Sequence, residues 1–338
     1  MSLENNKTEI EKISHRIFGY PPTFIQALPK SGSNRQYYRI WIRGCSYILC
    51  ISSNKKENIT FIRLSDYFRK KGLAVPRVYG YAPDFETYIT EDLGDTDLMK
   101  QLHSGKRTSE EVWGGIRMSI GQLAQFQLLN IGEWESLVEF EPFNRDLIRY
   151  DCKYAEENLI KISGVQYDKM KLKKDFENLE KKLLEYPFDY WGLMYRDFQS
   201  RNIMMSPTPY FIDYQSARFG PGIYDLVSFA WQAKAAFNKE ERMRIIEYYI
   251  FSRFGKDTRG AQILKNDLPH WAIFRILQTL GAYGLRGLKE GKRHFIESIP
   301  FALSNITEIL RKELQEDSYP EIRKIMENLK DLVILQKK

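Results

Sequence analysis

Residues 194–213, MYRDFQSRNIMMSPTPYFID, place acidic and amide side chains between short apolar runs, and the pattern predicts strand, loop, strand, turn, strand. Asp197 and Asn202 are separated by four residues, and Asp213 follows the apolar run 210–212. Phosphoryl-transfer enzymes use this order: the first carboxylate takes the acceptor hydroxyl's proton, and the asparagine and second aspartate hold magnesium. We therefore predict Asp197 as catalytic and Asn202 and Asp213 as Mg²⁺ ligands. The alternative is that Asp197 and Asn202 only cap a turn and that Asp213 only ends a strand.

The composition indicates a folded enzyme with two lobes. The 338 residues exceed the roughly 250–300 at which a single core stops growing. Hydrophobic residues make up 43% and aromatic residues 14%, which excludes disorder, and no apolar run approaches the ~20 residues of a membrane span. The first residues lack the apolar core of a signal peptide, so we expect a cytoplasmic protein with no membrane partner.

The net charge of +7 and the aromatic content raise the possibility of a nucleic-acid partner. However, Lys and Arg alternate with Asp and Glu along predicted helices, which is typical of solvated faces. A modest basic excess also suits an enzyme that binds a nucleotide. No nucleic-acid-binding module is visible, so we expect no nucleic-acid partner.

The first part of the chain predicts a small antiparallel sheet with two helices. Helical periodicity covers 9–18 and 56–71, and strand patterns cover 24–28, 37–42, 47–51 and 86–90. The loop before the second strand contains Ser31, Gly32 and Ser33, whose amides we expect to approach phosphates; the alternative is an ordinary hairpin turn. After the last strand, the backbone of Glu91 and Leu93 is expected to pair with an adenine edge, or else forms a surface loop.

Beyond residue 95 the periodicity is almost wholly helical. Thr108 and Glu111 predict a capping box that opens a helix through residue 129. Further helices are predicted over 146–162 and 170–184 and from residues 225, 240, 270, 301 and 320. Strands followed by helices indicate an α+β fold, which we divide into an N-terminal nucleotide-binding lobe (1–92) and a C-terminal catalytic and acceptor-binding lobe (93–338).

Three segments, GLMYRDFQSRNIMM, YFIDYQSARFGPGIYDLVSF and ITEDLGD, together resemble the aminoglycoside phosphotransferase/choline kinase superfamily. Within it, the chain is most similar to the bacterial N-acetylmuramate/N-acetylglucosamine anomeric kinases. The resemblance implies a two-lobed protein-kinase-like fold, with a small antiparallel sheet lobe and a larger, mainly helical lobe. It also implies ATP and Mg²⁺ as cofactors, the same roles for Asp197, Asn202 and Asp213, and an adenine-binding hinge from Glu91 to Leu93.

Two positions depart from the family pattern. Tyr195 stands where the family usually has a histidine, chiefly a packing residue, and tyrosine can fill that place. The third strand lacks the lysine that pairs with the nucleotide phosphates in kinases. We predict Arg39 in this role, with Arg35 as the alternative.

The sequence says least about the identity of the phosphate acceptor. Gln199, Gln215 and Arg218 flank the predicted catalytic groups, and we expect them to contact the acceptor or else to brace the loops. Asp225, at a predicted helix start, is expected to be structural. The amide-rich and cationic residues favour a neutral or anionic acceptor, and the resemblance implies N-acetylglucosamine or N-acetylmuramate phosphorylated at the anomeric hydroxyl. The alternatives are an aminoglycoside, choline, or a non-catalytic nucleotide-binding regulator; the oligomeric state stays open.

Overall fold

The computed structural model describes residues 3–29, 35–129, 132 and 136–335. The chain forms two compact units. Unit 1 contains residues 1–122, 130–140 and 201–217, and unit 2 contains residues 123–129, 141–200 and 218–338. The sequence-based division at residue 92 is a different one, because residues 93–122 and the segment 201–217 belong to the unit that carries the N-terminal sheet.

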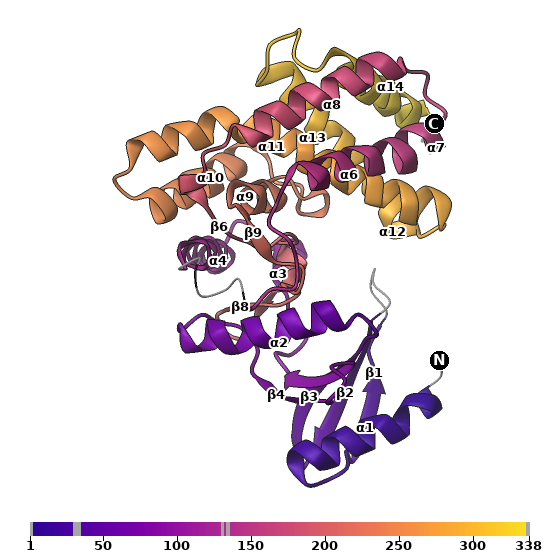
Figure 1. Cartoon of the computed structure of the whole chain (residues 1–338), viewed down its shortest axis with the longest axis vertical. Helices are drawn as coiled ribbons and strands as arrows, with labels where there is room; N and C mark the ends of the chain where they lie inside the picture. The colour runs from indigo at the N-terminus through magenta and orange to yellow at the C-terminus, as the bar shows by residue number, and fades with distance from the viewer. Residues whose placement is uncertain (1–2, 30–34, 130–131, 133–135, 336–338) are drawn as a thin grey trace. The chain divides into compact units, whose positions relative to one another are not determined.

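Unit 1 is built on a five-stranded antiparallel sheet in the order β1-β2-β3-β5-β4 (Figure 1). Its strands are β1 (Phe24–Ala27), β2 (Gln36–Ile42), β3 (Cys45–Ile51), β4 (Val78–Tyr81) and β5 (Thr87–Glu91). In the β2–β3 pair, Tyr37 lies opposite Cys50 and Arg39 lies opposite Ile48. The predicted strands are thus all present, with small shifts at their ends.

Two helices cover the two faces of this sheet. Helix α1 (Leu3–Phe18) places Ile10 and Ile13 in a buried cluster with residues such as Leu49 of β3. Because side chains alternate along a strand, Cys50 points to the other face. There, α2 (Lys55–Lys70) stacks Phe61 on Tyr88, with ring centroids 5.1 Å apart.

The hairpin of β7 (Ile203–Met205) and β8 (Pro209–Phe211) also belongs to unit 1. The Met205 N–H donates to the carbonyl of Thr96 at 2.8 Å, which attaches the hairpin beside α3 (Leu98–His103). Helix α4 (Glu110–Leu128) starts one residue later than predicted, because the Ser109 hydroxyl accepts the Val112 N–H at 3.3 Å. The predicted capping box on Thr108 is therefore wrong.

Unit 2 is mainly helical. Its helical segments are α6 (Arg145–Ala155), η1 (Glu156–Ile160), α7 (Lys161–Ser163), α8 (Lys169–Leu184), η2 (Phe188–Tyr190), α9 (Ile223–Ala230), η4 (Ala233–Ala235), α10 (Lys239–Phe254), α11 (Thr258–Tyr283), η5 (Gly284–Lys289), α12 (Arg293–Ile296), α13 (Ile299–Lys312) and α14 (Pro320–Leu335). A further short helix, η3 (Ser200–Asn202), lies where the chain passes from unit 2 to unit 1. Side chains of Asn144, Asp168, Asn238 and Asp257 cap α6, α8, α10 and α11.

The one sheet in the described part of unit 2 is the antiparallel pair of β6 (Trp191–Met194) and β9 (Arg218–Pro221). It leads the chain into and out of the segment 195–217. Among the described residues, no helix has the length and apolar character needed to cross a bilayer.

Candidate functional site

The predicted metal ligands meet in unit 1. The Asp213 carboxylate accepts hydrogen bonds from Asn202 Nδ2 at 3.1 Å and from Gln215 Nε2 at 2.6 Å. Asp213 has φ 70°, the left-handed region that few residues other than glycine adopt and that often marks a functional constraint. Gln215, predicted as an acceptor contact, is held here by Asp213, which is the bracing arrangement.

Contacts on both sides of Asp213 explain why the backbone adopts this shape. The Ile212 N–H donates to the carbonyl of Asn202 at 3.0 Å. The next residue, Tyr214, is fully buried; its hydroxyl lies 2.5 Å from Ser65 Oγ and its ring stacks on Phe61 of α2. The IDY sequence therefore ties the predicted metal-binding residues to α2.

Arg35, rather than Arg39, approaches these residues. Its Nη2 donates to the Glu57 carboxylate on α2, and its Nη1 lies 3.9 Å from Asp213 Oδ1. Arg39 is held by Asp92 and Asp95 instead, with Nε 2.7 Å from Asp92 Oδ2. Its hydrogen bond lowers the pKa of Asp95 below the usual value.

The structure describes the predicted adenine hinge but not the predicted phosphate loop. Ser31, Gly32 and Ser33 lie outside the described residues. At the hinge, the Glu91 N–H donates to the carbonyl of Arg77 at 2.8 Å, so it is engaged within the sheet. The carbonyl of Glu91 accepts a hydrogen bond from Thr90 Oγ1 at 3.5 Å.

The predicted catalytic residue Asp197 lies in unit 2. Its Oδ1 accepts hydrogen bonds from Gln199 Nε2 and, at 3.3 Å, from Arg275 Nη2 on α11. Arg275 is buried and its Nε donates to the Ser228 hydroxyl at 3.0 Å, which fixes the guanidinium. Sequence reasoning missed Arg275, because no local motif links it to a residue 78 positions away.

Asp225 holds the backbone that precedes Asp197. Its carboxylate accepts the N–H groups of Tyr195 at 2.7 Å and Arg196 at 3.0 Å. Burial raises the pKa of Asp225 to about 7, while these hydrogen bonds and one from Gln127 act in the opposite direction. Asp225, at the start of α9, thus fixes the backbone that leads to the predicted catalytic residue.

Three arginines lie close to one another in unit 2. Arg196 donates to Asp151 at 3.3 Å and lies over the Tyr224 ring, which Arg275 also faces. Burial, with the charge of Arg196, lowers the pKa of Arg218 to about 10. This arginine group, formed by Arg196, Arg218 and Arg275, lies among the carboxylates of Asp151, Asp197 and Asp225.

Tyr195, His270 and His294 pack against or bond to other side chains of the protein. Tyr195 is buried, with its ring 5.5 Å from that of Phe198, in keeping with the expected packing role. His270 bonds the Tyr319 hydroxyl at 2.8 Å, and His294 packs on Phe295. Among the described residues, no group of three or more His, Cys, Asp and Glu side chains is placed to hold a metal ion.

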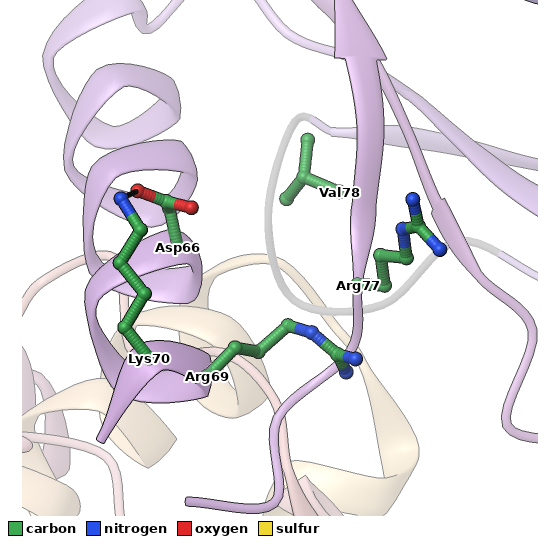
Figure 2. A pocket seen from close by; sticks show the side chains of 5 residues that line it. All are labelled: Asp66, Arg69, Lys70, Arg77 and Val78. Carbon is green, nitrogen blue, oxygen red and sulfur yellow. Dashed lines mark hydrogen bonds and ion pairs between the residues drawn. The ribbon is translucent and has the colours of Figure 1, made fainter. Parts of the chain in front are cut away.

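Unit 1 also has a pocket of about 430 Å³ between α2 and β4. Its lining is mostly charged, as Figure 2 shows: Asp66, Arg69, Lys70, Arg77 and Val78. Arg69 donates to the carbonyl of Val75 at 3.2 Å and lies 3.7 Å from the Glu91 carboxylate. No predicted site residue lines this pocket, although Arg69 connects it to Glu91.

Comparison with known proteins agrees with the motifs. Residues 25–262 match the model of the phosphotransferase enzyme family. The chain is 23% identical over 294 residues to the N-acetylmuramate/N-acetylglucosamine kinase of Pseudomonas aeruginosa, covering 83% of this chain and 82% of that protein. The enzyme of the same name from Neisseria meningitidis is also 23% identical, covering 82% of this chain and 83% of the relative.

Solved structures share the fold at low identity. One of them is a choline/ethanolamine kinase family protein from Mesorhizobium loti, with a TM-score of 0.63 at 14% sequence identity. The superposition covers 96% of this chain and 100% of that chain. A thermostable aminoglycoside phosphotransferase mutant, in a ternary complex with ADP and hygromycin B, has a TM-score of 0.59 at 15% identity, covering 90% of this chain and 98% of its own. These matches confirm the predicted kinase-like α+β fold.

Proposed function

The chain belongs to the phosphotransferase enzyme family and is a small-molecule kinase, and from this premise we propose its reaction. It transfers the γ-phosphate of ATP, with Mg²⁺, to the anomeric hydroxyl of an N-acetylated amino sugar. The observation that carries the proposal is the set of Asp197, Asn202 and Asp213 in the order that phosphoryl transfer requires.

Each residue has a role that its surroundings support. Asp197 takes the proton from the acceptor hydroxyl, and Gln199 and Arg275 hold its carboxylate. Asn202 Nδ2 donates to Asp213 Oδ2 at 3.1 Å, so the two side chains lie together, and the amide oxygen of Asn202 and the carboxylate of Asp213 would be the ligands. This donor set fits Mg²⁺, which binds few protein ligands and bridges the phosphates of the nucleotide.

The charge near Asp197 supports the choice of acceptor. An aminoglycoside is polycationic, so a site that selects it needs several carboxylates. Here Arg275 lies 3.3 Å from Asp197, and Asp151 is already engaged by Arg196, so these carboxylates are paired with guanidinium groups of the chain itself. An N-acetylated hexosamine offers hydroxyl and amide groups, and its lactyl ether also offers a carboxylate.

The proposed compartment is the cytoplasm, since the reaction consumes ATP.

The test is ADP release with amino sugars, plain hexoses, choline and aminoglycosides, followed by phosphorus NMR of the product. We expect turnover with N-acetylglucosamine or N-acetylmuramate and a phosphorus coupling to the sugar H1. Turnover confined to a cationic acceptor would contradict the proposed acceptor. Nucleotide binding without any phosphorylated product would instead favour the non-catalytic regulator.

A further inference from the structure

The buried guanidinium of Arg35 is the starting point. Arg35 directly precedes β2, and only 4% of its side chain is exposed. Glu57, in the first turn of α2, accepts from its Nη2, and Asp213 lies 3.9 Å from its Nη1. One cation thus lies beside both an acidic residue of α2 and a predicted metal ligand.

Strand β3 has no lysine or arginine at the position where protein kinases carry their phosphate-binding lysine. Cys50 of β3 lies opposite Tyr37, is fully buried, and points to the face covered by α2. In protein kinases, a lysine on the third strand pairs with a glutamate of the following helix and contacts the phosphates. Here that strand position carries a thiol, and burial raises its pKa above the ordinary value, so it is uncharged at neutral pH.

We propose that Arg35, held by Glu57, binds the nucleotide phosphates in place of a third-strand lysine. This inference rests on the proposed function, because it needs a nucleotide at Asp213. The charge has moved from the third strand to the start of the second, but it still meets a glutamate of α2.

An unused donor supports this assignment. The buried Nε of Arg35 has no hydrogen-bond acceptor in the part of the chain that the structure describes. A buried donor without an acceptor is rare and costly, and a phosphate oxygen would satisfy it with a charge-assisted hydrogen bond.

Arg39 is less suited to the role. It makes contacts of 2.7 Å with Asp92 and 2.8 Å with Asp95, so two carboxylates already neutralise it. Neither carboxylate belongs to α2 or to the predicted metal site.

The first experiment compares nucleotide affinities of Arg35→Met, Arg39→Met and the control Arg63→Met, which removes an exposed arginine of α2. We expect Arg35→Met to weaken Mg-ATP binding at least about tenfold, as for a lost hydrogen bond to a charged group. Adenosine binding should stay within about twofold in this variant, because the loss concerns only the phosphates. Unchanged Mg-ATP affinity in Arg35→Met, or a larger loss in Arg39→Met, would overturn the inference.

A rescue variant tests the relocation directly. In Arg35→Met/Cys50→Lys, a lysine on β3 should pair with Glu57 and recover part of the lost Mg-ATP affinity. No recovery in a folded double variant would contradict the replacement of one cation by the other.

A measurement on the wild type covers the case in which Arg35→Met does not fold. The Arg35 Nε–H signal, assigned by its disappearance in Arg35→Lys, should shift in ¹⁵N NMR when Mg-ADP is added and stay in place with adenosine. A signal that Mg-ADP leaves unmoved would overturn the inference. If wild-type protein binds no Mg-ATP at all, the proposed function itself fails, and this inference fails with it.

Discussion

The Asp197 carboxylate meets two side chains of its own unit, Gln199 and Arg275. Replacing Asp197 with Asn keeps the shape of the side chain but removes the carboxylate that we propose as the base for the acceptor's proton. We expect turnover to fall by roughly 10² to 10⁴, with nearly unchanged Mg-ATP affinity, because this side chain contacts the acceptor rather than the nucleotide. ADP release and calorimetry measure the two quantities.

Arg275 makes a folding control necessary for this variant. Its buried guanidinium loses a carboxylate partner and keeps Ser228, Gln278 and Thr279. Thermal unfolding should therefore be recorded alongside turnover. An Asn variant that retains wild-type turnover would show that another residue is the base.

Asp225 links stability to pH. Its pKa is raised to about 7 by burial, from an ordinary value of 3.8, so the folded protein binds a proton there that the unfolded chain has released. Its contribution to the free energy of unfolding therefore falls as pH rises from about 4 to about 7. Asp225→Asn should destabilise more at pH 5 than at pH 7.5, by roughly 2 kcal/mol.

Urea unfolding of wild type and Asp225→Asn at both pH values measures this difference. Asp66→Asn, on the exposed side of α2, controls for the loss of one carboxylate and should show no comparable change. A destabilisation by Asp225→Asn that is equal at both pH values would mean that Asp225 is ionised throughout this range in the folded protein.

Single residues show where sequence reasoning stops. The order of Asp197, Asn202 and Asp213 was readable because neighbouring positions carry the signal. The choice between Arg35 and Arg39 was not, because it depends on which carboxylates each guanidinium reaches. Arg275 had no local signal, since packing alone brings α11 to Asp197.

Among the elements, the start of α9 shows why the GPGIYD sequence carries information. Gln127 of α4 donates to the carbonyl of Gly222 at 3.0 Å and to Asp225 at 3.3 Å, and accepts from the Tyr249 hydroxyl. A Cβ at Gly222 would lie 2.6 Å from Gln127 Oε1. The glycine therefore lets one buried network hold both α9 and the backbone of Tyr195 and Arg196.

Gly222→Ala should destabilise the protein by about 1–3 kcal/mol, because the buried amide of Gln127 must move. It should also lower turnover, since Gln127 and Asp225 share the network. The matched control is Gly114→Ala in α4, where the nearest atom to an added Cβ is 3.9 Å away. Equal unfolding temperatures for the two variants would show that the close contact at Gly222 is relieved without cost.

The accuracy of the predicted helix boundaries depended on whether capping residues and helical periodicity indicated the same start. Helix α8 was predicted closely, because Asp168 caps it and its periodicity is regular. Helix α11 was predicted to begin at His270, but it begins at Thr258 and contains Pro269. A proline usually ends or kinks a helix, so the sequence before it did not indicate that the two parts form one element.

At the scale of the whole molecule, the α+β class and the kinase-like fold were predictable from strands followed by helices. The composition of the two compact units was not. Residues 201–217 belong to unit 1 through contacts such as that of Tyr214 with Ser65 and of Phe211 with Ala74. Pairings over such sequence distances leave no periodic signal, whereas a division at residue 92 follows the change from strand to helix pattern.

Nucleotide binding should stabilise the folded molecule in a metal-dependent way. A ligand present at 100 times its Kd adds about 2.7 kcal/mol to the free energy of unfolding. We therefore expect Mg-ATP to raise the unfolding temperature of the wild type, and EDTA to remove most of the increase. Asp213→Ala should lose the magnesium-dependent part, because Asn202 alone provides too few ligands.

The control for this experiment is Asp317→Ala, an exposed carboxylate in the turn before α14. It should keep the full response to Mg-ATP. An equal response in Asp213→Ala and wild type would remove Asp213 from the metal site. Because Arg35 lies 3.9 Å from Asp213, Asp213→Ala also removes one of the carboxylates beside that cation, and Glu57 stays in place. Residual binding of ATP without magnesium can therefore be stronger in this variant than in the wild type, which separates a lost metal ligand from a lost phosphate site.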